Sequence, residues 1–245
     1  MTFTFIKPGR GAWSTDSASH GLYLRITPTS TNRAGFIRSP LGNEQMIGSA
    51  WARKTDVTFP SEVVFEAAKV VQRLVGAEPD GLIGDGTGLM IANAQSTHGL
   101  KRDAVFGPVT ARALVTPIIE EAADEFNIPI ADIGGIAVHE SSMDPGAVGA
   151  VTGSDVSWFQ INMNAAAAAK FTIAQVCDPV FASHFTAKGM AAFVKKWKPK
   201  VGEALARTGA IANHNSPLQA QKWMETGSPQ AAFISQYVSD VRDAW

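Results

Sequence analysis

The sequence has almost no cysteine, the residue that forms the disulfides of small secreted proteins and many metal sites. Its 245 residues include one cysteine, Cys177, which cannot form an internal disulfide and leaves no cysteine pair for a zinc site. No run of about 18 apolar residues is present to cross a membrane. The first residues contain no apolar segment of signal-peptide length. We therefore expect packing to stabilise the fold, and we expect no signal peptide.

A strong net charge is also lacking. The chain has 21 Lys and Arg against 22 Asp and Glu, which leaves a net charge of −1. This balance excludes the broad basic surface of most nucleic-acid and anionic-membrane binders, so we expect neither as a partner. With 45% hydrophobic and 18% charged residues, the composition is that of a folded protein with two or three modules.

The chain divides into three parts by residue pattern. Residues 1–58 are rich in Thr, Ser, Gly and aromatic residues, and short alternating runs such as residues 21–27 predict strands and turns. From residue 59 apolar residues recur at helical spacing, from Val63 to Val75, behind Ser61 as an N-cap. Beyond residue 116 the pattern is helical. We predict a mainly α protein with a small β-rich segment at 1–58, a helical module at 59–115 and an α-rich domain at 116–245.

Four capping residues followed by proline mark helix starts in the second half. They are Thr116-Pro117, Asp178-Pro179, Ser216-Pro217 and Ser228-Pro229. Proline suits the first helical position because its missing N–H would have no partner there. Lysines 195–198 followed by Pro199 predict a helix end. The last helix is predicted to bury Ile234, Tyr237, Val238, Val241 and Trp245.

A short pattern occurs twice before the helical half. Residues 80–87 (DGLIGDGT) and 103–110 (DAVFGPVT) share Asp, Gly and Thr at the same positions, 23 residues apart. Each copy suits a turn in which Asp bonds its own backbone, Gly adopts a positive φ and Thr caps the next helix. On these residues alone, two similar turns are the preferred interpretation.

Together with His98-Gly99-Leu100, the two turns resemble the small three-helix peptidoglycan-binding module of bacterial and phage cell-wall hydrolases. The chain differs from that module at Ala104, where the second turn usually has Gly. It also differs at Ala94-Gln95, where an aromatic residue usually precedes the Gln. The resemblance implies a three-helix fold for residues 59–115 and bacterial peptidoglycan as the partner.

A single carboxylate ends an apolar helix of small residues. Residues 133–140 read IGGIAVHE, with Glu140 last. Loss of hydration favours the protonated form of a carboxylate, which a general acid near neutral pH requires. A solvated Glu at a helix end is nevertheless the commoner situation, and on this segment alone it is the preferred interpretation.

A second carboxylate, Asp155, follows 15 residues later. It opens the segment 155–162 (DVSWFQIN), which is rich in aromatic and amide side chains. Two carboxylates beside a groove lined by aromatic and amide side chains suit glycosidic cleavage, since aromatic faces stack on sugar rings and amides bond sugar hydroxyls. Asp155 is equally suited to capping a turn beside Gly153-Ser154. Both interpretations stay open.

Three segments together resemble the lysozyme-like superfamily, which includes muramidases and soluble lytic transglycosylases. They are Glu140-Ser141 with Pro145 and Ala147, Ser154-Asp155 with residues 158–162 (WFQIN), and residues 211–216 (IANHNS). All three follow the superfamily's order within 116–245. Ser157 stands where Gly is usual, and His214 where Tyr is usual.

The resemblance implies a role for each matching residue. Glu140 would be the general acid and Asp155 the second carboxylate, and the substrate-binding residues would be Ser141, Trp158, Gln160, Asn162, His214 and Asn215. Other chemistries lack their residues. His139-Glu140 begins like a zinc-protease motif, but Met143 occupies the position of the second His. No P-loop, nucleophile elbow or dinucleotide motif is present, so we expect no metal and no cofactor.

The sequence thus predicts a muramidase that cleaves the β-1,4 bond between MurNAc and GlcNAc in peptidoglycan. Two alternatives stay open: a lytic transglycosylase that forms 1,6-anhydroMurNAc ends, and a non-catalytic phage tail or wall-binding protein with a similar fold. Without a signal peptide we expect a phage lysin, carried in the virion tail or held in the host cytoplasm before release to the cell wall. Residues 1–58 are then expected to contact phage tail proteins.

Overall fold

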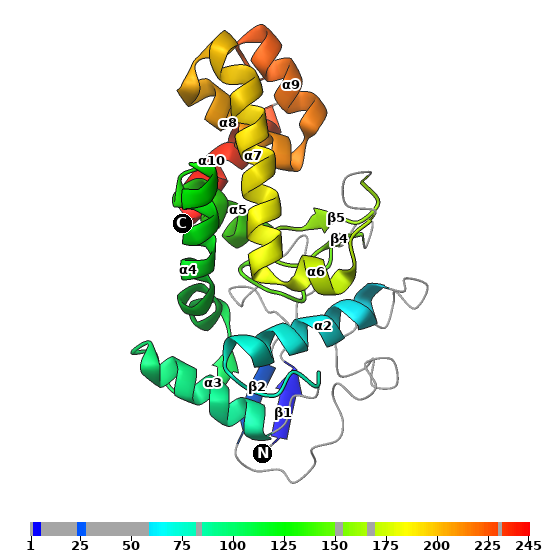
Figure 1. Ribbon diagram of the computed structural model, residues 1–245, viewed down its shortest axis with the longest axis vertical. Helices are drawn as coiled ribbons and strands as arrows, with labels where there is room; N and C mark the ends of the chain where they lie inside the picture. Colours follow the sequence, from blue (N-terminus) through cyan, green and yellow to red (C-terminus); the bar gives the residue numbers. More distant parts are fainter. Residues whose placement is uncertain are drawn as a thin grey trace. The chain divides into compact units, whose positions relative to one another are not determined.

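The structure is a computed structural model that describes residues 2–5, 24–27, 59–81, 85–149, 154–165, 170–229 and 232–245. These residues are mainly helical, which confirms the predicted class (Figure 1). They form two compact units: unit 1 comprises residues 1–115 and 140–179, and unit 2 comprises residues 116–139 and 180–245. The three-part division expected from the sequence stays a prediction. No helix in the described ranges is long and apolar enough to cross a membrane.

Unit 1 holds the first helices of the chain. They are α2 (Phe59–Leu74), α3 (Asp85–Thr97) and the start of α4 (Pro108–Phe126). The start of α2 agrees with the predicted change of pattern near residue 59. Its stripe of Val63, Val64, Ala67 and Val71 is buried, as the helical spacing predicted. Each buried valine contributes roughly 1.5 kcal/mol or more to the stability of the fold.

A small antiparallel sheet also belongs to unit 1. Its strands are β1 (Thr2–Phe5), β2 (Leu24–Thr27) and β3 (Val105–Phe106), in the order β1-β2-β3. β2 confirms the strand predicted in residues 21–27. Leu24 pairs with Phe106, so the sheet joins the N-terminal segment to the second repeated turn. The other strands and turns predicted for residues 1–58 lie outside the described residues.

The first repeated turn is held by a buried glutamine that the sequence analysis did not include. Gln72 Nε2 donates to Asp80 Oδ1 at 2.7 Å and to Thr87 Oγ1 at 3.3 Å. Gln72 Oε1 accepts the backbone N–H of Gly81 at 2.8 Å. One amide thereby joins the start of the turn, its glycine and the threonine of the next helix.

The second turn is held in the same way by Gln95. Its Nε2 donates to Asp103 Oδ1 at 2.8 Å and to Thr110 Oγ1 at 3.1 Å, and its Oε1 accepts the backbone N–H of Ala104 at 3.0 Å. Gln72 and Gln95 are themselves 23 residues apart. The pattern therefore repeats in four positions, and the Gln, Asp and Thr of each copy make equivalent hydrogen bonds. This favours one duplicated unit over two unrelated turns.

The two copies differ at the residue after Asp. Gly81 has a φ of +74°, and a Cβ there would lie 2.3 Å from Cε2 of the Phe65 ring. Ala104 has a φ of +57° at the equivalent position. An L side chain in this left-handed region costs roughly 1 kcal/mol relative to glycine. The departure from glycine noted in the sequence therefore places a strained residue in the second copy.

Unit 2 is a helical unit. It holds the rest of α4, α5 (Ile130–Ser141) up to residue 139, most of α7 (Pro179–Val201), and then α8 (Glu203–Asn215), α9 (Pro217–Thr226) and α10 (Ala232–Ala244). Two glycines of α5 let α10 approach closely. A Cβ on Gly134 would lie 2.3 Å from Cε3 of Trp245, and one on Gly135 would lie 2.1 Å from the Val241 carbonyl oxygen.

The buried stripe predicted for the last helix is largely confirmed. Ile234, Tyr237, Val238 and Val241 are buried on α10, while Trp245 is half-buried. The stripe and the glycine pair of α5 belong to the same unit. The close approach of α10 explains why the helix that leads to Glu140 has glycine at residues 134 and 135, because a side chain there would hold α10 away.

Two of the four predicted helix starts are confirmed. α7 begins at Pro179 and α9 at Pro217. For Ser228-Pro229, the structure describes α10 from Ala232, and residues 230 and 231 lie outside the described residues. The helix end predicted at Pro199 comes slightly later, because α7 continues to Val201. The next residue, Gly202, has a φ of +83°, which is incompatible with a helix.

The helix start predicted at Thr116-Pro117 is wrong, because α4 runs through Pro117 from Pro108 to Phe126. Proline removes one helical hydrogen bond, to the carbonyl of Ala113. Pro117 is exposed, so water can hydrate the groups near the break. Val115 and Ile119 are buried on either side of it, and their packing keeps the helix continuous. The boundary between the two units falls at this same turn, after Val115.

Candidate active site

The end of α5 carries the predicted general acid. Glu140 is half-buried in the last turn of this helix. The next residue, Ser141, is 1% exposed and donates its hydroxyl proton to the Trp158 carbonyl oxygen at 2.8 Å. Ser141 Oγ also accepts the backbone N–H of Asp144 at 3.2 Å. The structure thereby joins two of the three predicted segments, the Glu-Ser pair and the segment that contains Asp155.

A tight turn follows the Glu-Ser pair. Ser142 and Met143 have φ values of +55° and +63°, and both are non-glycine residues in the left-handed region. The buried Asp144 holds the turn, because its Oδ1 accepts the Gly146 N–H at 2.7 Å. Strained backbone of this kind persists only where the surroundings fix it, and it clusters at functional sites. Met143, which excluded a zinc-protease motif, is 1% exposed and belongs to the core.

The segment of Asp155 forms a hairpin from β4 (Asp155–Val156) and β5 (Ile161–Asn162). The chain after the tight turn pairs with the other edge of β4. Gly149 N donates to the Asp155 carbonyl oxygen and Ser157 N to the Ala147 carbonyl oxygen, both at 2.7 Å. Ser157, which replaces a usual glycine, has a φ of +66°, so its position is one that glycine favours.

Three polar side chains of the hairpin are half-buried, and two of them lie close to Gly149. Asn162 Nδ2 donates to Asp155 Oδ1 at 2.8 Å. A Cβ on Gly149 would lie 3.1 Å from Asp155 Oδ2 and 3.3 Å from Gln160 Oε1. The side chains of Asp155 and Gln160 therefore lie over the same bare Cα. The structure brings these three predicted site residues together.

The predicted substrate residue Trp158 lies in the core. It is 1% exposed, and its indole N–H donates to the Cys177 carbonyl oxygen at 2.6 Å. This bond ties the hairpin to α6 (Ile173–Cys177), whose N-terminus is closed by a capping box between Thr172 and Gln175. Trp158 and the equally buried Ser141 thus link elements of the unit. The substrate contacts expected of them stay predictions.

The helix α6 also packs on α2 of the predicted wall-binding module, within unit 1. Cys177 at its end is fully buried, and burial raises the pKa of its thiol far above the ordinary value. Arg73 of α2 forms an ion pair with Asp178 at 4.0 Å, which contributes little because both groups are well exposed. The segment of Glu140 and Asp155 therefore shares one compact unit with the module's first helix.

The third predicted segment lies in unit 2. His214 is half-buried and Asn215 is exposed, both at the end of α8. Ile211 and Ala212, one turn earlier, are buried and anchor the helix. The roles of His214 and Asn215 in binding substrate stay predictions, since the other site residues belong to unit 1.

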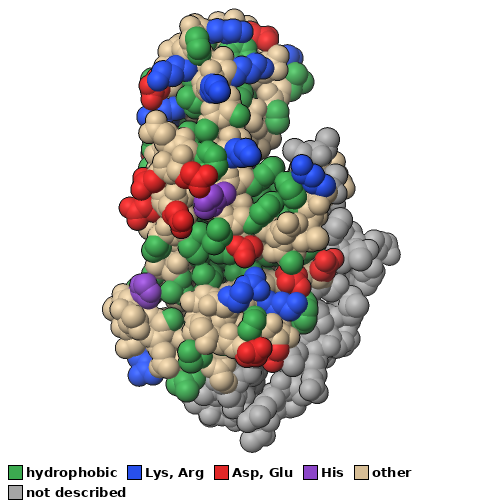
Figure 2. Space-filling view, in the orientation of Figure 1, with side chains coloured by type: hydrophobic (Ala, Val, Ile, Leu, Met, Phe, Trp, Pro, Cys, Tyr) green, Lys and Arg blue, Asp and Glu red, His purple; other side chains and the backbone are tan. Residues whose placement is uncertain are grey.

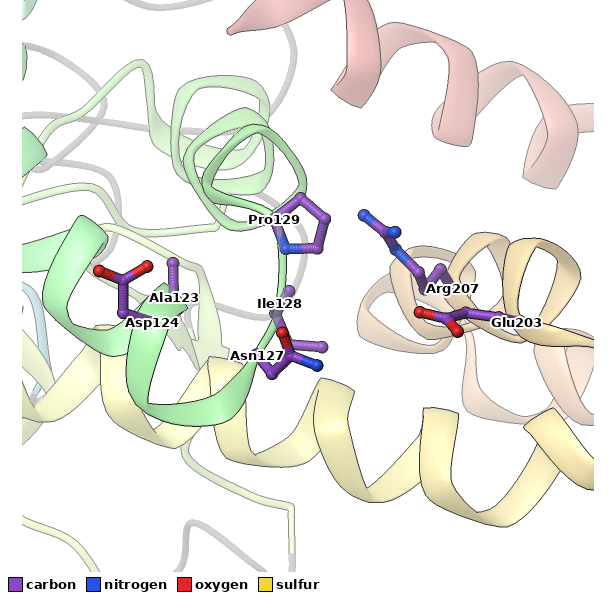
Figure 3. Close-up of a pocket in the computed structure, with 7 residues that line it drawn as sticks. All are labelled: Ala123, Asp124, Asn127, Ile128, Pro129, Glu203 and Arg207. Atoms are coloured by element: carbon purple, nitrogen blue, oxygen red, sulfur yellow. The ribbon is translucent and has the colours of Figure 1, made fainter.

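Unit 2 also contains a polar cavity of about 220 Å³ between the end of α4 and the start of α8. Figure 3 shows its lining: Ala123, Asp124, Asn127, Ile128, Pro129, Glu203 and Arg207. Two of its three charged residues form ion pairs within the chain, because Arg207 pairs with Asp132 at 3.6 Å and Glu203 with Lys198 at 2.8 Å. Burial raises the pKa of Asp132, and the Arg207 charge partly offsets that effect. The cavity was not expected from the sequence.

Basic side chains gather at the end of unit 2 that carries α8 and α9 (Figure 2). The last turns of α7, in the same unit, carry four exposed lysines, Lys195, Lys196, Lys198 and Lys200. Cations are favoured there by the dipole of a helix C-terminus, so a solvated helix end accounts for them. Among the described residues, no group of three His, Cys, Asp or Glu side chains is placed to hold a metal ion.

Comparison with known proteins adds no family assignment. No model of a protein family matches the chain, and no curated protein matches it. The resemblances noted in the sequence therefore rest on the motifs themselves.

Proposed function

We propose that the protein is a muramidase that cleaves the MurNAc–GlcNAc bond of peptidoglycan, with a lysozyme-like catalytic region and a wall-binding module of three helices. The observation that carries the proposal is the hydrogen bond from Ser141 to the Trp158 carbonyl oxygen at 2.8 Å. It joins the Glu-Ser pair to the hairpin of Asp155, Gln160 and Asn162. A carboxyl at a helix end beside a hairpin of acceptor and amide groups is suited to glycoside cleavage.

Glu140 is the general acid in this proposal. It is half-buried, so a glycosidic oxygen can approach it while part of its hydration is removed. Its carboxyl proton passes to the glycosidic oxygen as the bond to C1 breaks. The acid is needed whether water or the 6-hydroxyl of MurNAc then reacts at C1.

Asp155 is the second carboxylate. The bond from Asn162 holds it across the hairpin, in a position to stabilise the positively charged transition state or to activate water. This favours hydrolysis over transglycosylation. A non-catalytic wall-binding protein is the third candidate, and the core positions of Ser141 and Trp158 support it, because they reduce the number of groups that face a sugar.

Residues 59–115 supply peptidoglycan binding in the proposal, supported by the duplicated turns. The chain would then act as a phage lysin, carried in the virion tail or released from the host cytoplasm. In the first case, residues 1–58 contact phage tail proteins.

The test uses the full-length chain on purified sacculi. We expect it to sediment with them and to release soluble fragments, whereas Glu140→Gln should sediment equally and release almost none. The exposed Glu121 on α4 offers a matched control, since Glu121→Gln makes the same chemical change away from the site. Sacculi left intact by the wild-type chain would overturn the enzymatic proposal, and binding without release would support the wall-binding alternative.

A further inference from the structure

The amide of Asn162 is fully engaged by its own hairpin. Its Nδ2 donates to Asp155 Oδ1 at 2.8 Å and to Ser154 Oγ at 3.4 Å, and its Oδ1 accepts the backbone N–H of Asn164 at 2.9 Å. An amide nitrogen carries two protons, and both are directed to protein oxygens here. Asn162 is therefore better placed to hold Asp155 than to bind a sugar hydroxyl.

The backbone of Asn164 fixes the direction of this amide. The backbone N–H of Asn164 donates to the side-chain oxygen Oδ1 of Asn162, so the NH₂ group of the same amide turns toward Asp155. A hydrogen bond to a carboxylate is charge-assisted and stronger than one between neutral groups. The arrangement thus restrains Asp155 through a strong bond of fixed direction.

Gly149 also contacts Asp155 closely. A Cβ at this position would lie 3.0 Å from Asp155 Cβ and 3.1 Å from its Oδ2, which is closer than packed carbon and oxygen atoms tolerate without a shift. The backbone N–H of Gly149 also donates to the Asp155 carbonyl oxygen at 2.7 Å. Asp155 therefore occupies space that is free only because residue 149 is glycine, and a side chain at residue 149 would displace it.

We propose that Asn162 is a positioning residue that holds Asp155 for the attack of water, and that the pair thereby directs the reaction to hydrolysis. The inference rests on the proposed function, in which Glu140 cleaves the glycosidic bond. It gives Asn162 a role through Asp155 in place of the direct sugar contact that the sequence predicts.

The chemistry of the two outcomes differs at one step. In both, the bond from C1 to the glycosidic oxygen breaks, the oxygen keeps the electron pair and it takes the proton of Glu140. In hydrolysis a water oxygen bonds C1 while Asp155 accepts a proton from that water. If Asp155 is displaced, the 6-hydroxyl of the same sugar bonds C1 instead, and its proton passes to the ionised Glu140. The first route leaves a reducing MurNAc end and the second a 1,6-anhydroMurNAc end.

The test measures the ratio of these two ends by mass spectrometry after digestion of purified sacculi with full-length chains. We expect reducing ends from the wild-type chain. Asn162→Ala should raise the anhydro fraction by about tenfold, the change expected from loss of one charge-assisted hydrogen bond. Gly149→Ala should shift the ratio in the same direction, because it displaces the same carboxylate. Asn164→Ala is the matched control, since it removes an exposed side chain and keeps the backbone N–H.

The outcomes separate this inference from the proposed function. A wild-type ratio in both Asn162→Ala and Gly149→Ala would overturn the positioning role while leaving Glu140-dependent cleavage intact. If Asn162→Ala does not fold by circular dichroism, Gly149→Ala decides, and an unchanged ratio in it overturns the inference. A wild-type chain that yields only anhydro ends would also overturn it. Sacculi left intact by the wild-type chain would overturn the proposed function itself.

Discussion

The two repeated turns and the hairpin of residues 155–162 both contain amide side chains that make hydrogen bonds within the unit, but the amides of the turns are buried and those of the hairpin are not. Gln72 and Gln95 are 1% and 2% exposed, and their bonds go to the turn that each one holds. In the hairpin, Gln160 and Asn162 are half-buried beside a carboxylate. The buried glutamines therefore hold turns, whereas the partly exposed amides of the hairpin lie beside the candidate second carboxylate, and Asn162 holds it in place.

This contrast leads to opposite expectations for the two regions. Substitutions in the turns should change the free energy of unfolding and leave turnover per folded molecule unchanged. Substitutions of Glu140 or of the half-buried polar residue Asp155 should reduce turnover with little change in stability. The most informative measurements report both quantities for each variant.

The largest expected effect is that of Glu140→Gln. The substitution preserves shape but removes the transferable proton, so the rate of muropeptide release should fall by about 10²–10⁴-fold. The unfolding midpoint in denaturant should stay near that of the wild type, because Glu140 is only half-buried. Near-normal release at equal folded protein would contradict the assignment.

A smaller loss is expected for Asp155→Asn. Removal of a fixed charge beside the reacting centre should lower the rate by roughly 10²-fold. The amide can still meet Asn162 through its own oxygen, so the hairpin should remain folded. The rate on sacculi and the unfolding midpoint are measured together, and a change of only a few-fold in rate would favour the turn-capping interpretation of Asp155.

In the repeated turns, Gln95→Leu should act on stability alone. It leaves the backbone N–H of Ala104 without its acceptor and removes the donor to Thr110, while the N–H of Asp103 keeps only the Lys101 carbonyl oxygen at 3.0 Å. We therefore expect a loss of about 1–3 kcal/mol in unfolding free energy. Urea unfolding followed by circular dichroism measures this loss. A variant with normal stability would show that the glutamine does not hold the turn.

The smallest effect sharpens the comparison of the two copies. Ala104→Gly should stabilise the chain by about 1 kcal/mol, because it relieves a left-handed alanine. The reverse exchange, Gly81→Ala, should destabilise it, since the Cβ would meet the Phe65 ring at 2.3 Å. Urea midpoints of both variants test the pair, and equal shifts of the same sign would contradict the equivalence of the turns.

Much of the helical architecture could be predicted from local sequence. The stripe of α2, the stripe of α10 and the starts of α7 and α9 follow from spacing and capping rules. The continuity of α4 through Pro117 could not, because buried residues on both sides of the proline outweigh one lost hydrogen bond. The glutamines that hold the turns could have been predicted, because Gln72 and Gln95 each lie eight residues before the Asp of their turn.

The sequence could predict which residues lie at the candidate site, but not which of them face the interior or hold another side chain. The sequence named Asp155, Gln160 and Asn162, and the structure brings them together. It did not name Gly149, because only the folded hairpin shows that two side chains lie over its Cα. Burial of Trp158 and Ser141 was equally hidden, since residue type alone does not say whether an aromatic side chain in a turn or a hydroxyl at a helix end points into the core.

The most direct test of the central claim is the chemical identity of the glycan ends that the wild-type chain produces. Sacculi are digested to completion, reduced with borohydride and analysed by mass spectrometry, with undigested sacculi as the control. The account predicts new ends of reduced MurNAc, which identify hydrolysis of the MurNAc–GlcNAc bond. New ends of reduced GlcNAc, or glycan strands of unchanged length, would contradict it.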